Sequence, residues 1–415
     1  MPDTENMRRG VRATILAGAC VPGLLGVAHA APPDNPARAL ARAEPGDVVT
    51  LGARTYLLNR PLEVPRGVTL EGAKSGRTIL RINTKKIANF AYDFAVRPRG
   101  KAVDVTVKDL TIDGGLRAGE SLPENTGGGL KSGDRWTITN VTFTNINYFK
   151  VWLYEISGAT VRGNTFTADP GVRGRNDNIG GGRSARLLID DNTFTASSTG
   201  SAIDLLRSRR IRIQDNTLNG TPDAERSMFL EGVTDSVVSG NTIRHGAVTA
   251  KSDRGYSAYG DLTNPANIRI TGNRISDSPE AGIAVVYASA KRGQSAGGAN
   301  VVSGNTITRS GRDAIVMLHC APTTLAPDRI ARNTISDAFT VAEYWSTGCG
   351  IVGPSAIAVT GGFGTVVRAN TVTDTRRGLV AAVWFGANGV KVQQADGTES
   401  GTITSPGLPA AHYVR

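Results

Sequence analysis

The sequence contains little cysteine, few aromatic residues and no helical periodicity. Its 415 residues include three cysteines, and Phe, Trp and Tyr together make up 6% of the chain. No stretch of useful length repeats apolar residues at the 3.6-residue spacing of an amphipathic helix, which excludes a helical bundle. After residue 30 no apolar run is long enough to cross a bilayer. Glycine is abundant instead, with 50 residues, and predicts many turns.

The first thirty residues are typical of an export signal. Arg8, Arg9 and Arg12 form a basic start, residues 15–28 are mostly apolar, and Ala28-His29-Ala30 fits a cleavage site. We therefore expect a secreted, extracellular protein. The alternative is a buried N-terminal helix.

The charge of the chain suits acidic partners. The signal segment carries three arginines against Asp3 and Glu5, so its removal changes the formal charge from +11 to +10. Outside the cell, a basic protein meets anionic polysaccharides more often than nucleic acid, although a general enrichment in arginine explains the charge equally well. We expect a polysaccharide partner, no nucleic acid and no membrane. Cys320 and Cys349 remain in the mature chain, and an oxidising compartment predicts a disulfide between them.

A seven-residue stretch is written twice. VVSGNTI occurs at 237–243 and again at 301–307, and its relative RITGNRI stands midway at 269–275. The spacings between the related stretches are 24, 28, 24, 25, 32, 32, 28 and 37 residues. A short minimum spacing between repeats, with a variable number of additional residues, is typical of a stacked repeat whose loops differ in length. The stretches are centred on Asn140, Asn164, Asn192, Asn216, Asn241, Asn273, Asn305, Asn333 and Asn370.

Each repeat has the same predicted layout. An alternating apolar strand leads to the Asn, a second short strand follows, and a polar loop precedes a third strand such as AIDLL or GIAVV. The recurrent Asn predicts a bend with a left-handed residue, and because Asn tolerates this conformation best after Gly, we expect the Asn to adopt it. Coils of three strands must stack at about 4.8 Å to bury their apolar side chains. In register, the Asn side chains would hydrogen-bond along the stack.

With these repeats the chain resembles the right-handed parallel β-helix proteins of the pectate-lyase-like superfamily. The resemblance extends from GDVVTL near the start to VVRANTV near the end. It implies an all-β solenoid with three short strands per coil. Asn35-Pro36 before ARALARA predicts a short capping helix. The predicted parts are a signal peptide (1–30), a linker with the capping helix (31–44), the parallel β-helix (45–390) and a C-terminal tail (391–415).

The resemblance implies an active face on the strand that precedes the Asn corner, beside the variable loops. Counting back from each Asn places Glu155, Arg183, Arg207 and Glu231 on one outward stripe, on the order of 15 Å long. The alternative is a solvated face whose charges pair across coils. Further candidates are Trp152 and Asp204 on the strands, Arg175 and Asp177 in a loop, Lys251 and Tyr256 in the longest insertion, and Tyr287 and His319 further along.

Two reactions fit these residue types, and β-elimination from a uronate polymer is our first prediction because the face carries cations. Arg183 or Arg207 would neutralise the substrate carboxylate, and Lys251 or Tyr256 would act as the base. Alternatively, carboxylates of successive coils would hold Ca²⁺. No other cofactor is expected.

Hydrolysis is the alternative reaction, and it requires two carboxyl groups about 5 Å or 6.5–9.5 Å apart. The candidate pairs are Asp204 with Glu231 and Asp177 with Asp204. In either enzyme, substrate would bind to Arg183, Arg175, Trp152, Glu155, Tyr256, Tyr287 and His319. A third possibility is a non-catalytic carbohydrate-binding or adhesion module.

Family motifs do not decide between the reactions. KVWLYEIS at 150–157 resembles the W-I-D-H segment of pectate lyases, but Tyr154 and Glu155 stand where Asp and His would be. The G-H-G segment of polygalacturonase-like hydrolases and the D-P-H-D segment of uronan epimerases are absent. No catalytic role is therefore carried over from these families.

Overall fold

The computed structural model describes most of the chain from residue 32 to residue 386, together with a last short strand. The predicted signal segment, both cysteines of the predicted disulfide and Tyr256 lie outside the described residues. Residues 33–415 form one unit. The described residues are 32–73, 77–195, 200–220, 227–253, 263–287, 297–319, 326–340, 345–346, 351–360, 365–375, 379, 381–386 and 411–413.

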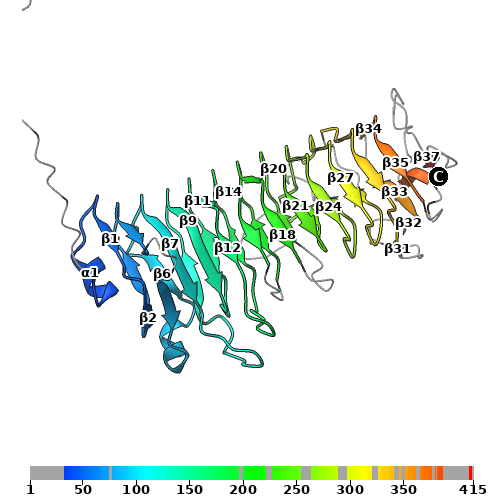
Figure 1. Cartoon of the computed structure of the whole chain (residues 1–415). Helices are drawn as coiled ribbons and strands as arrows, with labels where there is room; N and C mark the ends of the chain where they lie inside the picture. Colours follow the sequence, from blue (N-terminus) through cyan, green and yellow to red (C-terminus); the bar gives the residue numbers. More distant parts are fainter. Residues whose placement is uncertain are drawn as a thin grey trace, which may run out of the picture. The chain divides into compact units, whose positions relative to one another are not determined.

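The chain is a stack of coils, each built from three strands. A strand of the first column leads through a corner into a strand of the second column, and these two columns form a 22-stranded sheet. A third strand then joins a 13-stranded sheet, and within both sheets each strand pairs in parallel with those of the coils before and after. Figure 1 shows the stack from β1 (Val48–Thr50) to β37 (Ala411–Tyr413). The predicted parallel β-helix is confirmed.

The strands of the three columns have the following bounds. The first column contains β1, β4 (Thr69–Glu71), β7 (Thr106–Asp113), β9 (Thr137–Thr144), β11 (Thr160–Arg162), β14 (Leu188–Asp190), β17 (Arg212–Gln214), β20 (Val237–Ser239), β23 (Arg269–Thr271), β26 (Val301–Ser303), β29 (Arg329–Ala331) and β34 (Val366–Arg368). The second contains β2 (Thr55–Leu58), β5 (Ile79–Ile82), the ends of β7 and β9, β12 (Thr165–Phe166), β15 (Thr193–Phe194), β18 (Thr217–Asn219), β21 (Thr242–Arg244), β24 (Arg274–Ser276), β27 (Thr306–Thr308), β30 (Thr334–Ser336) and β35 (Thr371–Thr373). The 13-stranded sheet contains β3 (Leu62–Val64), β6 (Phe94–Pro98), β8 (Gly128–Lys131), β10 (Val151–Tyr154), β13 (Ile179–Gly182), β16 (Ile203–Leu206), β19 (Met228–Glu231), β22 (Val248–Lys251), β25 (Ile283–Tyr287), β28 (Ile315–His319), β33 (Ser355–Thr360), β36 (Ala381–Gly386) and β37.

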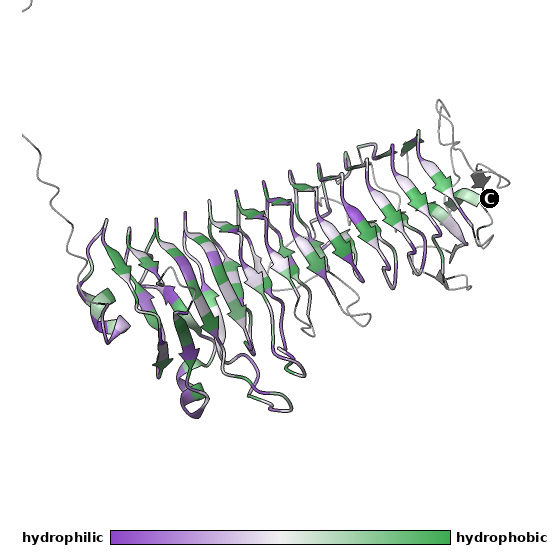
Figure 2. Ribbon diagram, in the orientation of Figure 1, coloured by the Kyte–Doolittle hydropathy of each residue, from purple (hydrophilic) through white to green (hydrophobic). Residues whose placement is uncertain are grey.

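Alternation along each strand makes the core. In β20 and β21, Val238 and Ile243 point inward and are 1% exposed, whereas their strand neighbours face outward. Figure 2 shows this alternation as green and pale or purple bands across the strands of the 22-stranded sheet. Inside the stack, side chains of the same type from successive coils pack on one another. An example is the set of parallel rings of Phe143, Phe166 and Phe194. VVSGNTI recurs because two coils need the same two inward residues and the same corner.

The corner between the first two columns is held by a ladder of buried asparagines. The Oδ1 atom of Asn241 accepts hydrogen bonds from the backbone N–H and the side-chain amide of Asn216, both at 2.9 Å. The side-chain amide of Asn241 in turn donates to Oδ1 of Asn273 at 2.9 Å. The predicted ladder is confirmed. It runs through Asn164, Asn192, Asn216, Asn241, Asn273, Asn305, Asn333 and Asn370.

The left-handed residue at this corner is the one before the Asn, which corrects the sequence prediction. Gly240 and Gly272 have φ values of 67° and 65°, and Asp191 and Asp215 both have 54°. Asn140 occupies this preceding position, with φ 52°, and the backbone N–H of Val141 donates to Asn164. Asn140 therefore lies outside the ladder. The Asn side chain is needed inside the corner, and the bend is made by its neighbour.

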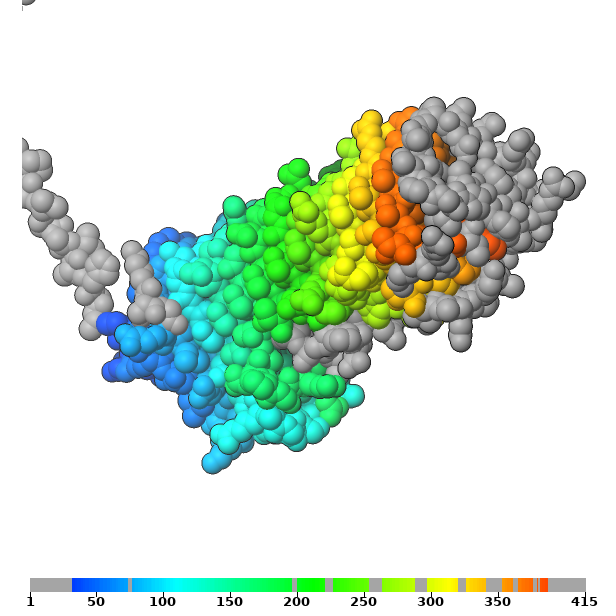
Figure 3. Space-filling model, turned by 45° about the vertical axis from the view of Figure 1, so that its right-hand side comes forward, coloured from blue at the N-terminus to red at the C-terminus, as the bar shows by residue number. Residues whose placement is uncertain are grey.

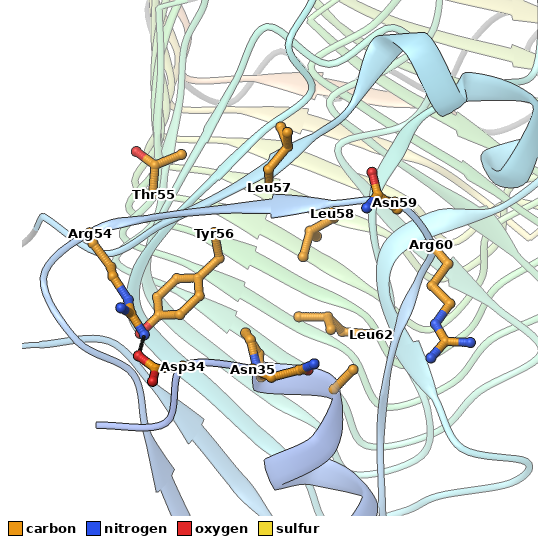
Figure 4. Close-up of a pocket in the computed structure, with 12 residues that line it drawn as sticks. Asp34, Asn35, Arg54, Thr55, Tyr56, Leu57, Leu58, Asn59, Arg60 and Leu62 are labelled. Atoms are coloured by element: carbon orange, nitrogen blue, oxygen red, sulfur yellow. Dashed lines mark hydrogen bonds and ion pairs between the residues drawn. The ribbon is translucent and has the colours of Figure 1, made fainter. Parts of the chain in front are cut away.

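A short helix covers the N-terminal end of the stack. In α1 (Pro36–Arg42), the side chain of Asn35 accepts from the backbone N–H of Arg38 at 3.0 Å, and Pro36 occupies the first turn. The predicted N-cap is confirmed, and Leu40 is fully buried against the first coil. A pocket lies between α1 and β2, where Arg54 pairs with Asp34 beside the ring of Tyr56 (Figure 4).

The remaining elements are small. A 3-10 helix, η1 (Thr84–Phe90), follows β5, and β31 (Trp345–Ser346) pairs antiparallel with β32 (Ile351–Val352). The strand β37 pairs with β36, so the 13-stranded sheet extends into residues 391–415, for which the sequence predicts a tail. Within the described residues, no helix is both long and apolar enough to span a membrane.

Replacing Asn241 with Ala is expected to destabilise the stack. The substitution removes five hydrogen bonds of the Asn241 side chain, and it leaves the buried backbone N–H of Asn216 without its acceptor. We expect a loss of at least about 3 kcal/mol in the free energy of unfolding, measured by urea denaturation.

Asn219→Ala is the matched control, because Asn219 is an exposed residue of β18. It should change the free energy of unfolding by less than about 0.5 kcal/mol. Equal effects of the two substitutions would contradict a structural role of the ladder.

Candidate functional site

The candidate site is the outward face of five strands of the 13-stranded sheet: β10, β13, β16, β19 and β22. We call this surface the candidate face. The register aligns its outward residues in two columns that run along the stack. The first column is Trp152, Gly180, Asp204, Phe229 and Thr249, and the second is Tyr154, Gly182, Leu206, Glu231 and Lys251. Trp152 and Asp204 thus share a column, as the sequence predicted.

Aromatic rings gather at the N-terminal end of this face. Phe149 lies 4.4 Å from Trp152 between ring centroids, and Trp152 is stacked against Tyr154 at 5.5 Å. The sheet must be flat beneath them, because a Cβ atom on Gly180 would approach the ring of Phe149 to 2.4 Å. The partly exposed aromatic rings, together with Gly180 and Gly182 on the neighbouring strand, form a surface on which a sugar ring can stack.

The charged residues of the face are paired with one another. Arg183 lies 2.9 Å from Glu155, and both side chains are about half exposed, at 48% and 52%. Lys251 lies 2.8 Å from Glu231, and its Nζ atom is 4.1 Å from the centre of the Phe229 ring. The alternative of charges pairing across coils therefore describes part of this face. The cations that favoured β-elimination already have carboxylate partners.

Arg207 is a partly buried residue with a structural ion pair as well as a member of the stripe. Its side chain is 13% exposed and forms an ion pair with Asp253, whose side chain is fully buried. A buried carboxylate needs such a partner. The predicted catalytic role of Arg207 stays a prediction, and the ion pair with Asp253 gives this residue a structural role as well.

Glu231 lies one position away from its predicted place. The register aligns Glu231 with Leu206, and the backbone N–H groups of Arg207 and Gly232 donate to Glu231 and Lys251. Gly232 therefore continues the stripe of Glu155, Arg183 and Arg207, all with positive φ. The residues of the stripe form the turns at the ends of the strands. Glu231 instead is the last residue of its strand and faces outward beside this stripe.

Two titratable groups at the start of the strands have altered pKa values. Burial raises the pKa of the Asp177 carboxyl to about 6, and the nearby charge of Glu231 adds to this effect, while a hydrogen bond from the Ser201 backbone opposes it. Burial lowers the pKa of Lys150 to about 7, and its ammonium donates to the side chain of Asn178. Asp177 is partly exposed and adjoins the face, whereas Lys150 is 3% exposed.

Tyr287 and His319 point into the core, which corrects their assignment to substrate binding. They are 1% and 3% exposed, and their rings stack at 4.4 Å. The hydroxyl of Tyr287 donates to Asp328 at 2.6 Å, and the two nitrogens of His319 face Asp328 and the carbonyl of Thr360. Burial raises the pKa of Tyr287. The cluster links three coils from within and cannot contact a polymer.

Arg175 belongs to a lateral cluster of loops. It donates to the hydroxyl of Ser121 at 2.6 Å and lies 3.5 Å from Glu124. Leu116, Leu122 and Val172 pack together beneath it. In Figure 3, the cyan and green loops of this region lie against each other along the lower edge of the molecule. Arg175 therefore connects its own loop to the loop that contains Ser121 and Glu124, beside the candidate face.

Three residues of this site were not predicted from the sequence: Lys150, Phe149 and Phe229. The alternation of KVWLY gives the signal for Lys150, because outward residues Trp152 and Tyr154 imply that residue 150 faces the same way. Among the described residues, no three His, Cys, Asp or Glu side chains form a group that could hold a metal ion.

Comparisons with known proteins identify the architecture. Residues 126–295 match the family model described as right-handed β-helix region. No curated protein matches this chain in sequence. The predicted resemblance to right-handed parallel β-helix proteins is confirmed at the level of the fold.

Three solved structures illustrate the likeness. A PL6 alginate lyase in complex with a trisaccharide is 14% identical, with 91% of each chain covered and a TM-score of 0.54. An exopolygalacturonase from Thermotoga maritima is 12% identical, with 73% of this chain and 82% of that chain covered and a TM-score of 0.54. The tailspike protein of E. coli bacteriophage HK620 with a pentasaccharide is 11% identical, with 91% and 73% covered and a TM-score of 0.51. At such identities the similarity establishes the fold alone.

Replacing Arg207 with Ala is expected to unfold the coil around it. The substitution leaves the fully buried Asp253 carboxylate without its cation. We expect a loss of about 3–5 kcal/mol in the free energy of unfolding, measured by urea denaturation.

Arg183→Ala provides the comparison, because its pair with Glu155 is half exposed. It should cost less than about 1 kcal/mol. If Arg207→Ala is as stable as Arg183→Ala, the buried pair does not hold this part of the fold together.

Proposed function

We propose that the chain is a secreted enzyme that hydrolyses glycosidic bonds of a polysaccharide lying along the candidate face. The observation that carries this proposal is the contrast between two carboxyl groups. Asp177 has its pKa raised to about 6, whereas Glu231 is ion-paired with Lys251. A carboxyl group with a raised pKa beside a carboxylate in an ion pair is the kind of pair that supplies the acid and the base of glycoside hydrolysis.

The arrangement gives each residue a role. Asp177 protonates the departing glycosidic oxygen, and Glu231 activates the attacking water. Asp204 comes from the coil between them and faces the same way as Glu231. Asp177 and Glu231 lie two coil steps apart, about 9.6 Å along the stack, so we expect room for a water molecule and inversion at the anomeric carbon. Trp152 and Tyr154 provide the surface on which a neighbouring sugar unit stacks.

β-Elimination from an acidic polysaccharide is a second candidate, favoured by the exposed pair of Arg183 and Glu155. A half-exposed ion pair contributes little stability, so a substrate carboxylate could replace Glu155 on Arg183. Lys251 would then act as the base. The fold shared with an alginate lyase is consistent with this reaction. The same face would also serve a carbohydrate-binding or adhesion protein without catalysis.

A panel of neutral and acidic polysaccharides distinguishes these functions. Hydrolysis produces new reducing ends without the absorbance of an unsaturated uronate, whereas elimination produces both. Retention on a polymer without either product would indicate binding alone. Detection of the unsaturated product would contradict the proposed hydrolysis.

Asp177→Asn and Glu231→Gln are each expected to lower kcat by about 10²-fold or more. In the wild type, kcat should fall as the pH rises through about 6, because Asp177 then loses the proton that it donates. The Asp177→Asn variant should lack this alkaline limb.

Asp235→Asn is the matched control, since Asp235 lies at another corner of the stack, where it accepts from the side chain of Asn267. It should retain wild-type kcat. Full activity of Asp177→Asn would rule out the assigned acid.

A further inference from the structure

The outward strand positions of the 22-stranded sheet include arginines and no acids over its C-terminal half. From β17 and β18 to β34 and β35, six coils each present two outward positions on each of two strands, which makes 24 positions. We call this surface the basic face. None of its positions is Asp or Glu, twelve are Ser or Thr, and six are Arg: Arg212, Arg244, Arg269, Arg274, Arg329 and Arg368.

The arginines are regularly spaced. Arg212, Arg269 and Arg329 occupy one column of the first strands, and a valine separates each from the next. Because coils are about 4.8 Å apart, these guanidinium groups recur at about 9.6 Å along the stack. Arg274 follows Arg269 on the other side of the Asn273 corner. The result is a two-dimensional array of cations set among hydroxyl groups.

These cations are available to a ligand. Arg212, Arg244, Arg269 and Arg274 are exposed. In the described part of the chain, the one ion pair on this face is between Arg244 and Asp277, at a long 3.8 Å. Arginines elsewhere are held more closely, such as Arg135, which makes two hydrogen bonds of 2.6 and 2.8 Å to Asp104. One acid, Asp215, lies at the corner between the two strand columns of this face. Other acids lie at the margins of the face, before the first strand or after the second: Asp235, Asp277, Asp337 and Asp374.

We propose that the basic face binds an anionic polysaccharide independently of the candidate face. Guanidinium groups donate two parallel hydrogen bonds to carboxylate or sulfate groups, and serine and threonine hydroxyls pair with sugar hydroxyls. A flat array suits an extended polymer better than a small anion, because no single point concentrates the charge. A membrane surface is a poorer fit, since the face has no aromatic or long apolar side chain to enter lipid.

The basic face and the candidate face lie on different sheets, so binding to one leaves the other accessible. The basic face belongs to the 22-stranded sheet, whereas the candidate face belongs to the 13-stranded sheet. A polymer held on the basic face therefore leaves the candidate face open. The protein can remain attached to an acidic matrix while another chain lies on the candidate face, and the attachment does not depend on what reaction occurs there.

The test uses the full chain with three substitutions, Arg212→Gln, Arg269→Gln and Arg274→Gln. Binding to fluorescently labelled heparin and alginate is measured at several salt concentrations, with neutral dextran as the uncharged polymer. We expect the Kd at low salt to rise by about 10- to 100-fold, and the dependence of Kd on salt to become weaker. Binding is measured without turnover, so its outcome is separate from that of the hydrolysis assay.

A second triple variant, with Arg38, Arg42 and Arg117 changed to Gln, removes the same charge from exposed residues outside the basic face. Its Kd should stay within about twofold of the wild type if position decides binding. An equal loss in both variants would reduce the effect to net charge and overturn the proposal. Wild-type binding by the first variant would also overturn it, as would arginine-dependent binding to phosphatidylglycerol vesicles with no such dependence for either polymer.

Discussion

The ladder of buried Asn side chains is the constraint on which the register of the strand columns depends. At the corner between two strands, backbone N–H groups leave the sheet and need another acceptor. Each ladder Asn supplies its Oδ1 atom to the N–H of the preceding coil, and its own amide donates to that coil and to the next Asn. Since a buried amide without a partner is costly, a coil displaced by one residue would lose several hydrogen bonds. The ladder thereby sets the register of every strand that follows it.

The register of the strands brings residues that are distant in sequence next to each other, and the two sheets differ in which charged residues it brings together. On the 13-stranded sheet, acids and bases meet across coils, as in Glu231 with Lys251 and Arg207 with Asp253. On the 22-stranded sheet, the outward strand positions of the basic face include six arginines and no acid. An array of exposed arginines thus lies on a different sheet from the surface where we place catalysis. This separation could not be inferred from the net charge.

Local patterns allowed the fold to be predicted, whereas the site depended on register. Alternation, the recurrent Asn and the Asn35-Pro36 cap each act over a few residues, and each was visible in the sequence. Glu231 was misplaced because it stands ten residues before its corner Asn, whereas the residue that continues the stripe, Gly232, stands nine before it, as Arg207 does in its own coil. Tyr287 was assigned to the surface, although Ile283 and Val285 on the same strand face inward, and alternation places residue 287 with them. The burial of Asp253 beneath Arg207 is a contact between coils that no sequence pattern encodes.

The central claim is that these coils stack in one continuous register. Spin labels attached to cysteines at Thr217 and Thr371, in a variant lacking the native cysteines, test it directly by double electron–electron resonance. These residues occupy one outward column five coil steps apart. The account predicts a narrow distribution centred near about 24 Å. A broad distribution, or a separation beyond about 35 Å, would contradict the stacking.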